Sequence, residues 1–136
     1  MTVRQVQVTF DCADPAALSG FWAEALGYEL DDPPVGFASW DEALDAWGVP
    51  EERRNDASAV HDPTGAGPRL YFQRVPEPKV TKNRVHLDIL VADLDAAVAE
   101  VVARGASIVR RSDDPDDIFV TVADPEANEL CLVGYL

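Results

Sequence analysis

Hydrophobic and polar residues alternate in two short segments that begin matching halves of the chain. Apolar side chains take every second position in residues 6–10, and residues 85–89 repeat the alternation. A period of two is typical of a strand that buries one face. Each segment is followed by an aspartate, then by a stretch in which apolar residues recur at helical spacing, and then by a glycine. Because these features recur together roughly 79 residues apart, we interpret the chain as an internal duplication.

The two helical stretches have recognisable ends. Asp14 and Asp93 precede them and can accept hydrogen bonds from the free N–H groups of the first turn, and Pro15 suits the first helical position. Gly27 and Gly105 follow them and allow a left-handed closing residue. Apolar residues recur at helical spacing between these limits, which predicts two helices that each bury one face.

Short strand-like runs follow each helical stretch and predict a strand–helix–strand–strand–strand order in both halves. Turn-rich connections separate the members of two hairpins. The runs cover residues 57–61, 69–73, 107–111, 118–122 and 130–133. We therefore predict an α+β fold of two tandem βαβββ modules in a single domain, residues 1–136. Module 1 covers about 1–75, a Pro-rich linker about 76–82, and module 2 about 83–136.

Module 1 also holds a predicted helical insertion at residues 39–48. Ser39 and Glu42 have the spacing of a capping box at its start. Trp40 and Trp47 share one face at helical spacing. Two interpretations stay open, because these tryptophans can cover the core or line a ligand pocket.

Alternation also predicts which polar side chains lie away from the helices. If Leu70 and Leu130 meet the helices, their neighbours in the strand face the opposite, concave side of the sheet. The same argument applies to the first strand of each half. The predicted concave face carries Gln7, Arg69, Tyr71, His86, Asp88 and Glu129, with Cys131 on the same side as Glu129. His61 precedes a turn and is expected to be exposed.

Composition and charge exclude some partners. Hydrophobic residues make up 47 % of the 136 residues, as is ordinary for a globular protein. Eleven Lys and Arg oppose 25 Asp and Glu, for a formal charge of −14. Such a balance argues against binding to a phosphate backbone, so no nucleic-acid partner is expected. An acidic surface tolerates cationic small molecules.

Two cysteines and the start of the chain bear on location. Cys12 and Cys131 lie in apolar runs, where a reduced thiol is the usual state, and two cysteines do not make a disulfide scaffold. The first residues lack a signal pattern, and no apolar run approaches the length of a membrane span. We expect a cytoplasmic protein with no membrane partner.

Four segments of the chain form a characteristic set: Asp11–Pro15, Phe21-Trp22 with Leu26-Gly27, Asn83–Asp88 and Asp124–Cys131. Together they resemble the vicinal oxygen chelate superfamily, and most closely its glyoxalase-like branch. The branch is related to glyoxalase I, bleomycin-resistance proteins and extradiol dioxygenases. The resemblance implies paired modules that form a curved mixed sheet, a cup with the helices outside, around a small-molecule site, and a homodimer.

The resemblance also implies where a metal would bind. Metal-using members take one ligand from the first strand and one carboxylate from the last strand of each module. His86 and Glu129 match these positions in module 2, and suit a divalent ion such as Zn, Ni, Mn or Fe. Module 1 departs from the pattern, because Gln7 offers only an amide oxygen and Arg69 is a permanent cation. Arg69 can pair with Glu129 or hold a substrate carboxylate.

Two functions stay open. The first is a small-molecule-binding protein with a degenerate metal site, which binds an apolar or aromatic ligand in the cup. Its expected ligand-binding residues are Gln7, Trp40, Trp47, Arg69, Tyr71, His86 and Glu129. The alternative is a metal-dependent lyase, isomerase or dioxygenase that uses His86 and Glu129 as metal ligands. No catalytic residue is assigned.

Overall fold

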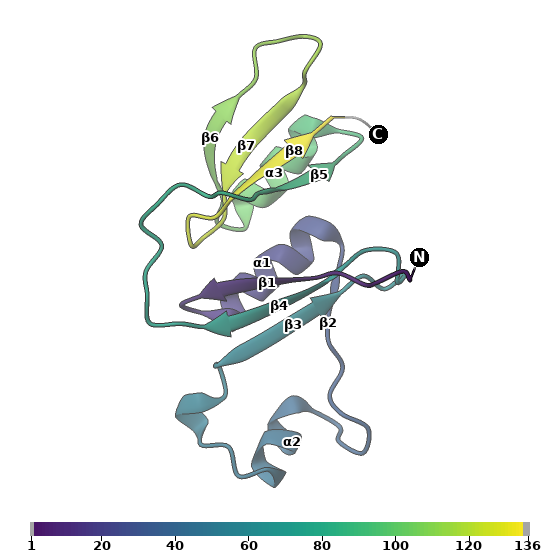
Figure 1. The fold of residues 1–136 in the computed structure, drawn as a ribbon, viewed down its shortest axis with the longest axis vertical. Coiled ribbons are helices and arrows are strands. Elements are labelled where there is room, and N and C mark those ends of the chain that lie inside the picture. Colours follow the sequence, from purple (N-terminus) through teal and green to yellow (C-terminus); the bar gives the residue numbers. More distant parts are fainter. Residues whose placement is uncertain (1, 135–136) are drawn as a thin grey trace.

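The computed structural model describes residues 2–134 as two four-stranded sheets with their helices (Figure 1). The first half contains β1 (Gln7–Cys12), α1 (Pro15–Leu26), β2 (Glu29–Leu30), α2 (Trp40–Ala46), a 3₁₀ turn (Glu51–Arg53), β3 (Ala57–His61) and β4 (Arg69–Arg74). The second half contains β5 (Leu87–Leu90), α3 (Leu94–Ala103), β6 (Ser107–Arg111), β7 (Phe119–Ala123) and β8 (Glu129–Val133). Within the described residues, no helix has the length and apolar character that a membrane crossing requires.

The two sheets have the same topology, which confirms the predicted α+β fold of two βαβββ modules. The strand orders are β1-β4-β3-β2 and β5-β8-β7-β6. In each sheet the first strand runs parallel to the last, and the other neighbours are antiparallel. Figure 1 places β1 and β5 at the facing edges of the two sheets. The curved arrangement is open, because β1 and β5 are not paired by backbone hydrogen bonds.

The helices start and stop where the sequence predicts. The Asp14 side chain accepts a hydrogen bond from the Ala17 N–H, and Asp93 accepts one from the Ala96 N–H. Gly27 closes α1 with a φ of 70°, a left-handed conformation that glycine adopts without steric cost.

One hydrophobic core joins both modules and confirms most of the predicted strand faces. Leu70 and Leu130 are buried against the helices, as the alternation requires. The core contains Cys12, Leu18, Phe21, Trp22, Val60, Leu70, Phe72, Val98, Val101, Ala106, Val120, Val122, Leu130 and Leu132. The prediction is wrong for Val6 and Val85, which are 73 % and 79 % exposed. Both residues precede their strands, where the helices no longer cover the chain.

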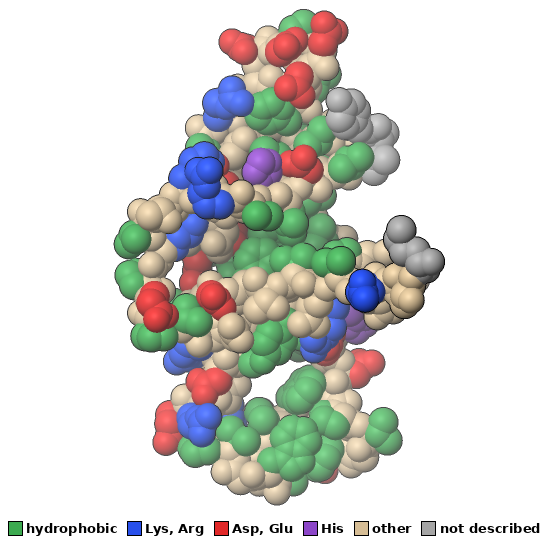
Figure 2. Space-filling model, viewed as in Figure 1, with side chains coloured by type: hydrophobic (Ala, Val, Ile, Leu, Met, Phe, Trp, Pro, Cys, Tyr) green, Lys and Arg blue, Asp and Glu red, His purple; other side chains and the backbone are tan. Residues whose placement is uncertain are grey.

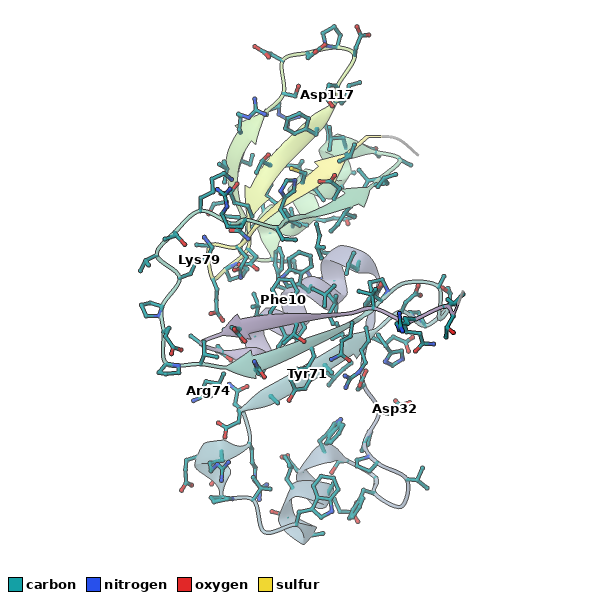
Figure 3. All side chains as sticks on the ribbon, in the orientation of Figure 1. Phe10, Asp32, Tyr71, Arg74, Lys79 and Asp117 are labelled. Atoms are coloured by element: carbon teal, nitrogen blue, oxygen red, sulfur yellow. The ribbon has the colours of Figure 1, made fainter. Side chains whose placement is uncertain are left out.

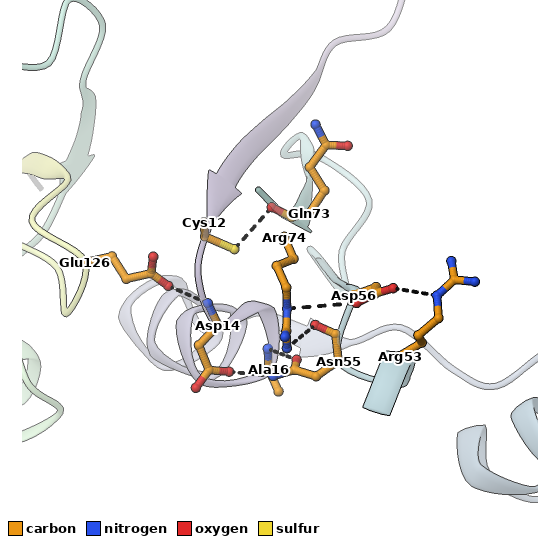
Figure 4. A network of polar contacts seen from close by, with 9 residues as sticks. All are labelled: Cys12, Asp14, Ala16, Arg53, Asn55, Asp56, Gln73, Arg74 and Glu126. Atoms are coloured by element: carbon orange, nitrogen blue, oxygen red, sulfur yellow. Dashed lines mark hydrogen bonds and ion pairs between the residues drawn. The ribbon is translucent and has the colours of Figure 1, made fainter. Parts of the chain in front are cut away.

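Polar contacts, one of them buried, join the two modules. The Trp22 indole N–H on α1 donates to the Asp124 carboxylate at 3.0 Å, although Asp124 is only 4 % exposed. Two residues further on, Glu126 accepts hydrogen bonds from the N–H groups of Ala13 and Asp14 at the start of α1, and Figure 4 shows the contact with Asp14. The turn between β7 and β8 therefore fixes the first helix of the other module.

The insertion between β2 and β3 lies at the far end of the first sheet (Figure 1). Ser39 accepts a hydrogen bond from the Glu42 N–H, as a capping box predicts, while the Glu42 carboxylate accepts one from the Ala38 N–H. The Trp40 indole donates to the Asp31 carbonyl at 2.8 Å. Hydrophobic side chains gather on this part of the surface in Figure 2, and Trp47 is 55 % exposed.

Replacement of Trp22 by Phe tests the contact between the modules. The substitution removes the indole donor from a buried carboxylate, so the free energy of unfolding should fall by about 2 kcal/mol. Chemical denaturation measures this value, and Trp47→Phe on the exposed insertion should change it by less than about 0.5 kcal/mol. Equal effects of the two substitutions would contradict the proposed importance of the Trp22–Asp124 bond.

Candidate functional site

The exposed face of the second sheet forms a cavity of about 670 Å³. Alternation along the strands places one set of side chains in the cavity and the other set in the core. The lining residues are Lys82, His86, Asp88, Val109, Arg110, Asp117, Phe119, Thr121, Glu129, Cys131 and Val133. They come from the four strands of the second sheet and from segments adjoining them, so module 2 supplies this cavity together with Lys82 from the linker.

Three potential metal-ligating side chains meet on the β5–β8 side of the cavity. β5 runs parallel to β8 with Asp88 opposite Cys131, and His86 lies two residues before Asp88. The His86 Nε2 and Asp88 Oδ1 atoms are 3.3 Å apart. One ligand atom from each of the three residues lies within 4.8 Å of the others.

Glu129 lines the same cavity, but its carboxylate forms an ion pair with a lysine. Its carboxylate accepts a hydrogen bond from Lys82 Nζ at 2.9 Å. This hydrogen bond lowers the pKa of Glu129 below its ordinary value, with smaller favourable contributions from the charges of Lys79 and His86. Lys82 thus stabilises the ionised form of a carboxylate whose side chain is only 21 % exposed.

A second polar network crosses the exposed face of the first sheet. Arg69 donates through Nε to Asp31 Oδ2 at 2.9 Å and through Nη1 to Gln7 Oε1 at 2.8 Å. The register explains the second contact, because Gln7 pairs with Arg69 across β1 and β4. His61 Nδ1 lies 2.8 Å from the other Asp31 oxygen. Asp31 therefore joins an arginine and a histidine from neighbouring strands.

These contacts test one of the two alternatives considered for Arg69, its pairing with Glu129. An Arg69–Glu129 ion pair is not formed among the described residues, since Asp31 pairs with Arg69 and Lys82 pairs with Glu129. Arg69 also lies 5.6 Å from the ring centroid of Tyr71 in a cation–π contact. The Arg69 guanidinium is therefore held by residues of module 1.

The structure divides the predicted ligand-binding residues among three places. His86 and Glu129 line the cavity of the second sheet. Figure 3 shows Tyr71 on the first sheet and Asp117 at the far end of the second sheet. The residues that do not line that cavity are Gln7, Arg69 and Tyr71 on the first sheet, and Trp40 and Trp47 on the insertion.

Two residues that shape these sites are not predicted by the sequence pattern. Lys82 falls in the predicted linker and Asp31 in no predicted site, although each holds a predicted site residue. No local pattern signals these contacts, because the partners are 47 and 38 residues apart in the chain. Phe119 could have been found, since it alternates with buried Val120 on β7.

The residues at the four ligand positions that the resemblance implies do not fit a four-ligand metal centre. The Gln7 amide oxygen already accepts a hydrogen bond from Arg69. A guanidinium repels a divalent cation, and Arg69 stands where a carboxylate is needed. In module 2, His86 and Glu129 are suitable ligand types, but the Glu129 carboxylate already accepts a hydrogen bond from the Lys82 ammonium.

Two four-stranded sheets of the same topology, with a cavity on the exposed face of the second, have the paired-module architecture that the resemblance to the vicinal oxygen chelate superfamily implies. The sequence profile described as "Glyoxalase-like domain" matches residues 7–133. The chain therefore belongs to the glyoxalase-like domain family, which confirms the resemblance. No curated protein matches the sequence.

Solved structures share the fold at low sequence identity. The bleomycin-binding protein of Streptomyces verticillus, complexed with copper(II)-bleomycin, is 18 % identical with a TM-score of 0.58, and the match covers 100 % of this chain and 99 % of that one. A mutant of the fosfomycin resistance protein FosX of Listeria monocytogenes, complexed with Mn(II) and a dihydroxypropylphosphonic acid, is 10 % identical with a TM-score of 0.67 and coverages of 100 % and 93 %. A glyoxalase/bleomycin resistance protein/dioxygenase family enzyme of Burkholderia phytofirmans is 14 % identical, with a TM-score of 0.64 and coverages of 93 % and 94 %.

Removal of the Lys82 ammonium tests its effect on Glu129. In Lys82→Ala the pKa of Glu129 should rise toward its ordinary value, because the hydrogen bond that favours the ionised form is lost. Carboxyl-carbon NMR titration measures this pKa. Lys79→Ala removes only a more distant charge and should raise it less. An unchanged pKa in Lys82→Ala would show that the two side chains do not pair in solution.

Proposed function

We propose that this protein binds an apolar or aromatic small molecule in the cavity of the second sheet. The observation that carries the proposal is the cavity itself, whose volume of about 670 Å³ lies in the usual range for ligand sites. Its walls combine apolar side chains with a few polar groups, a mixture typical of small-molecule sites. Structural neighbours include a protein complexed with copper(II)-bleomycin and one complexed with a phosphonic acid.

Each part of the cavity has a distinct task in this proposal. Phe119 offers an aromatic surface, and Arg110 stacks over its ring at 4.9 Å. Val109 and Val133 add apolar contacts. The charged groups Lys82 and Glu129 orient the polar end of the ligand. The formal charge of −14 favours a ligand with some cationic character over a polyanion.

We further propose that a homodimer completes the site. Gln7, Arg69 and Tyr71 lie on the first sheet, outside the cavity formed by the second. A second copy could bring its first sheet over this cavity. Exposed apolar side chains beside the facing sheet edges support such an interface, including Val85 at 79 % and Leu90 at 49 %.

A metal-dependent lyase, isomerase or dioxygenase is the second candidate function. The favouring observation is that His86 and Glu129 line one cavity, as expected for ligands of a shared ion. The fixed Arg69 argues against the complete four-ligand site of such enzymes. A cytoplasmic location suits both candidates, because the thiols of Cys12 and Cys131 are unpaired.

Ligand binding can be tested with Phe119→Ala. Isothermal titration of the wild-type protein with bleomycin, with and without copper(II), and with the aromatic dye ANS should reveal saturable binding by at least one aromatic compound. The substitution should weaken that binding about tenfold, because it removes the aromatic contact. Ile118→Ala changes the adjacent residue, which does not line the cavity, and should bind normally. Equal affinities of the two variants would place the ligand elsewhere.

The dimer can be tested with Val85→Asp. Sedimentation equilibrium should give twice the chain mass for the wild-type protein and a lower average mass for the variant, because a buried charge opposes association. Val35→Asp in the connection between β2 and α2 is the matched control, since Val35 is fully exposed and lies away from the facing sheet edges. A monomeric wild-type protein would overturn the dimer while leaving the cavity on the second sheet intact.

A further inference from the structure

The cluster of His86, Asp88 and Cys131 differs from the metal-ligand set expected from the family. In that set the last strand contributes Glu129, whereas in the structure the ligand atoms that lie together are a histidine nitrogen, a carboxylate oxygen and a cysteine sulfur. Cys131 follows Glu129 by two residues and lies on the same face of β8. The strand therefore presents two alternative ligands to the cavity.

The separations in this cluster are close to those of a small tetrahedral metal centre. Metal bonds of about 2.0 Å to nitrogen or oxygen and 2.3 Å to sulfur place neighbouring ligand atoms roughly 3.3–3.8 Å apart. His86 Nε2 and Asp88 Oδ1 are already 3.3 Å apart, and the whole set lies within 4.8 Å. Side-chain rotations that bring the more distant atoms closer by about 1.5 Å or less would close the remaining gap.

The surroundings permit a metal to enter and keep one coordination position open. The side chains of His86 and Asp88 are 50 % and 56 % exposed, and Cys131 is half-buried in the wall of the cavity. The Thr121 hydroxyl lies 3.2 Å from the Cys131 sulfur and can donate a hydrogen bond to a thiolate. Three protein ligands leave a fourth position for water or for a ligand in the cavity.

Glu129 is the less available ligand. Its carboxylate is already engaged by the Lys82 ammonium at 2.9 Å, and an ion at this carboxylate would meet a like charge. Within the cluster, by contrast, a thiolate, a carboxylate and a neutral imidazole carry two negative charges that balance a divalent cation. The donor set also decides the kind of metal, because sulfur and imidazole ligands select zinc-like ions over magnesium or calcium.

We propose that His86, Asp88 and Cys131 form a site for a thiophilic divalent metal of the zinc class on the wall of the cavity. The site needs no residue of module 1, so it is compatible with the Arg69–Asp31 pair and with a monomer or a dimer. Binding displaces the proton of the Cys131 thiol to solvent, with no change of oxidation state. The inference goes beyond the proposed small-molecule binding and does not require it.

Cobalt(II) provides the direct test, because a thiolate bound to cobalt gives an intense charge-transfer absorption in the near ultraviolet. Titration of the full chain under reducing conditions should produce this band with saturation at one equivalent. Cys131→Ser should abolish it, and His86→Ala, at a half-exposed position, should weaken cobalt affinity by about tenfold or more. Cys12→Ala removes the other thiol and should keep the band. An absent or unsaturable band, or one that survives Cys131→Ser, would overturn the site.

Glu129→Gln separates this site from the ligand set expected from the family. The cobalt band and affinity should be retained in this variant, whereas loss of binding in Glu129→Gln with retention in Cys131→Ser would overturn the proposal. Alkylation gives a second readout, since Zn²⁺ should protect Cys131 from iodoacetamide at least tenfold in wild type and not in His86→Ala. Titrations with bleomycin or ANS in chelator test the proposed function separately, so either idea can fail alone.

Discussion

The fold depends on a buried carboxylate in the turn between β7 and β8. Asp124 is 4 % exposed, and it accepts hydrogen bonds from the Trp22 indole, the Glu126 N–H and both the backbone and side chain of Asn128. A buried charge without such partners would be strongly unfavourable. These bonds shape the turn that presents Glu126 to the start of α1. One set of hydrogen bonds thus orders a hairpin of module 2 and joins it to module 1.

Two basic side chains, Arg69 and Lys82, determine which ligands the two sheet faces can bind. The chain carries 25 acidic and 11 basic residues, yet a basic side chain replaces or pairs with the carboxylate at both positions where the family would use a free one. Arg69 replaces the carboxylate on the first sheet and is fixed by Asp31. Lys82 neutralises Glu129 on the second. Both contacts make a four-ligand metal site less favourable, and they leave Cys131, whose sulfur contacts the neutral Thr121 hydroxyl at 3.2 Å, as an alternative ligand beside Glu129.

Periodicity predicted the features that depend on neighbouring residues. The burial of Leu70 and Leu130 follows from alternation, and the end of α1 at Gly27 follows from a residue that tolerates positive φ. The prediction failed at Val6 and Val85 because alternation does not reveal where the helices stop covering a strand. It also could not choose the partner of Arg69, since Asp31 follows a strand of only two residues.

The amino-acid order by itself determined the duplicated modules, the helix ends and the side of each strand on which His86, Asp88 and Cys131 lie. These are properties of local backbone geometry, which the side-chain period and the turn residues specify directly. Tertiary structure decided that Lys82 meets Glu129, that Asp31 meets Arg69, and that the cavity belongs to the second sheet. Such contacts join residues far apart in the chain, so they follow from the packing of whole elements.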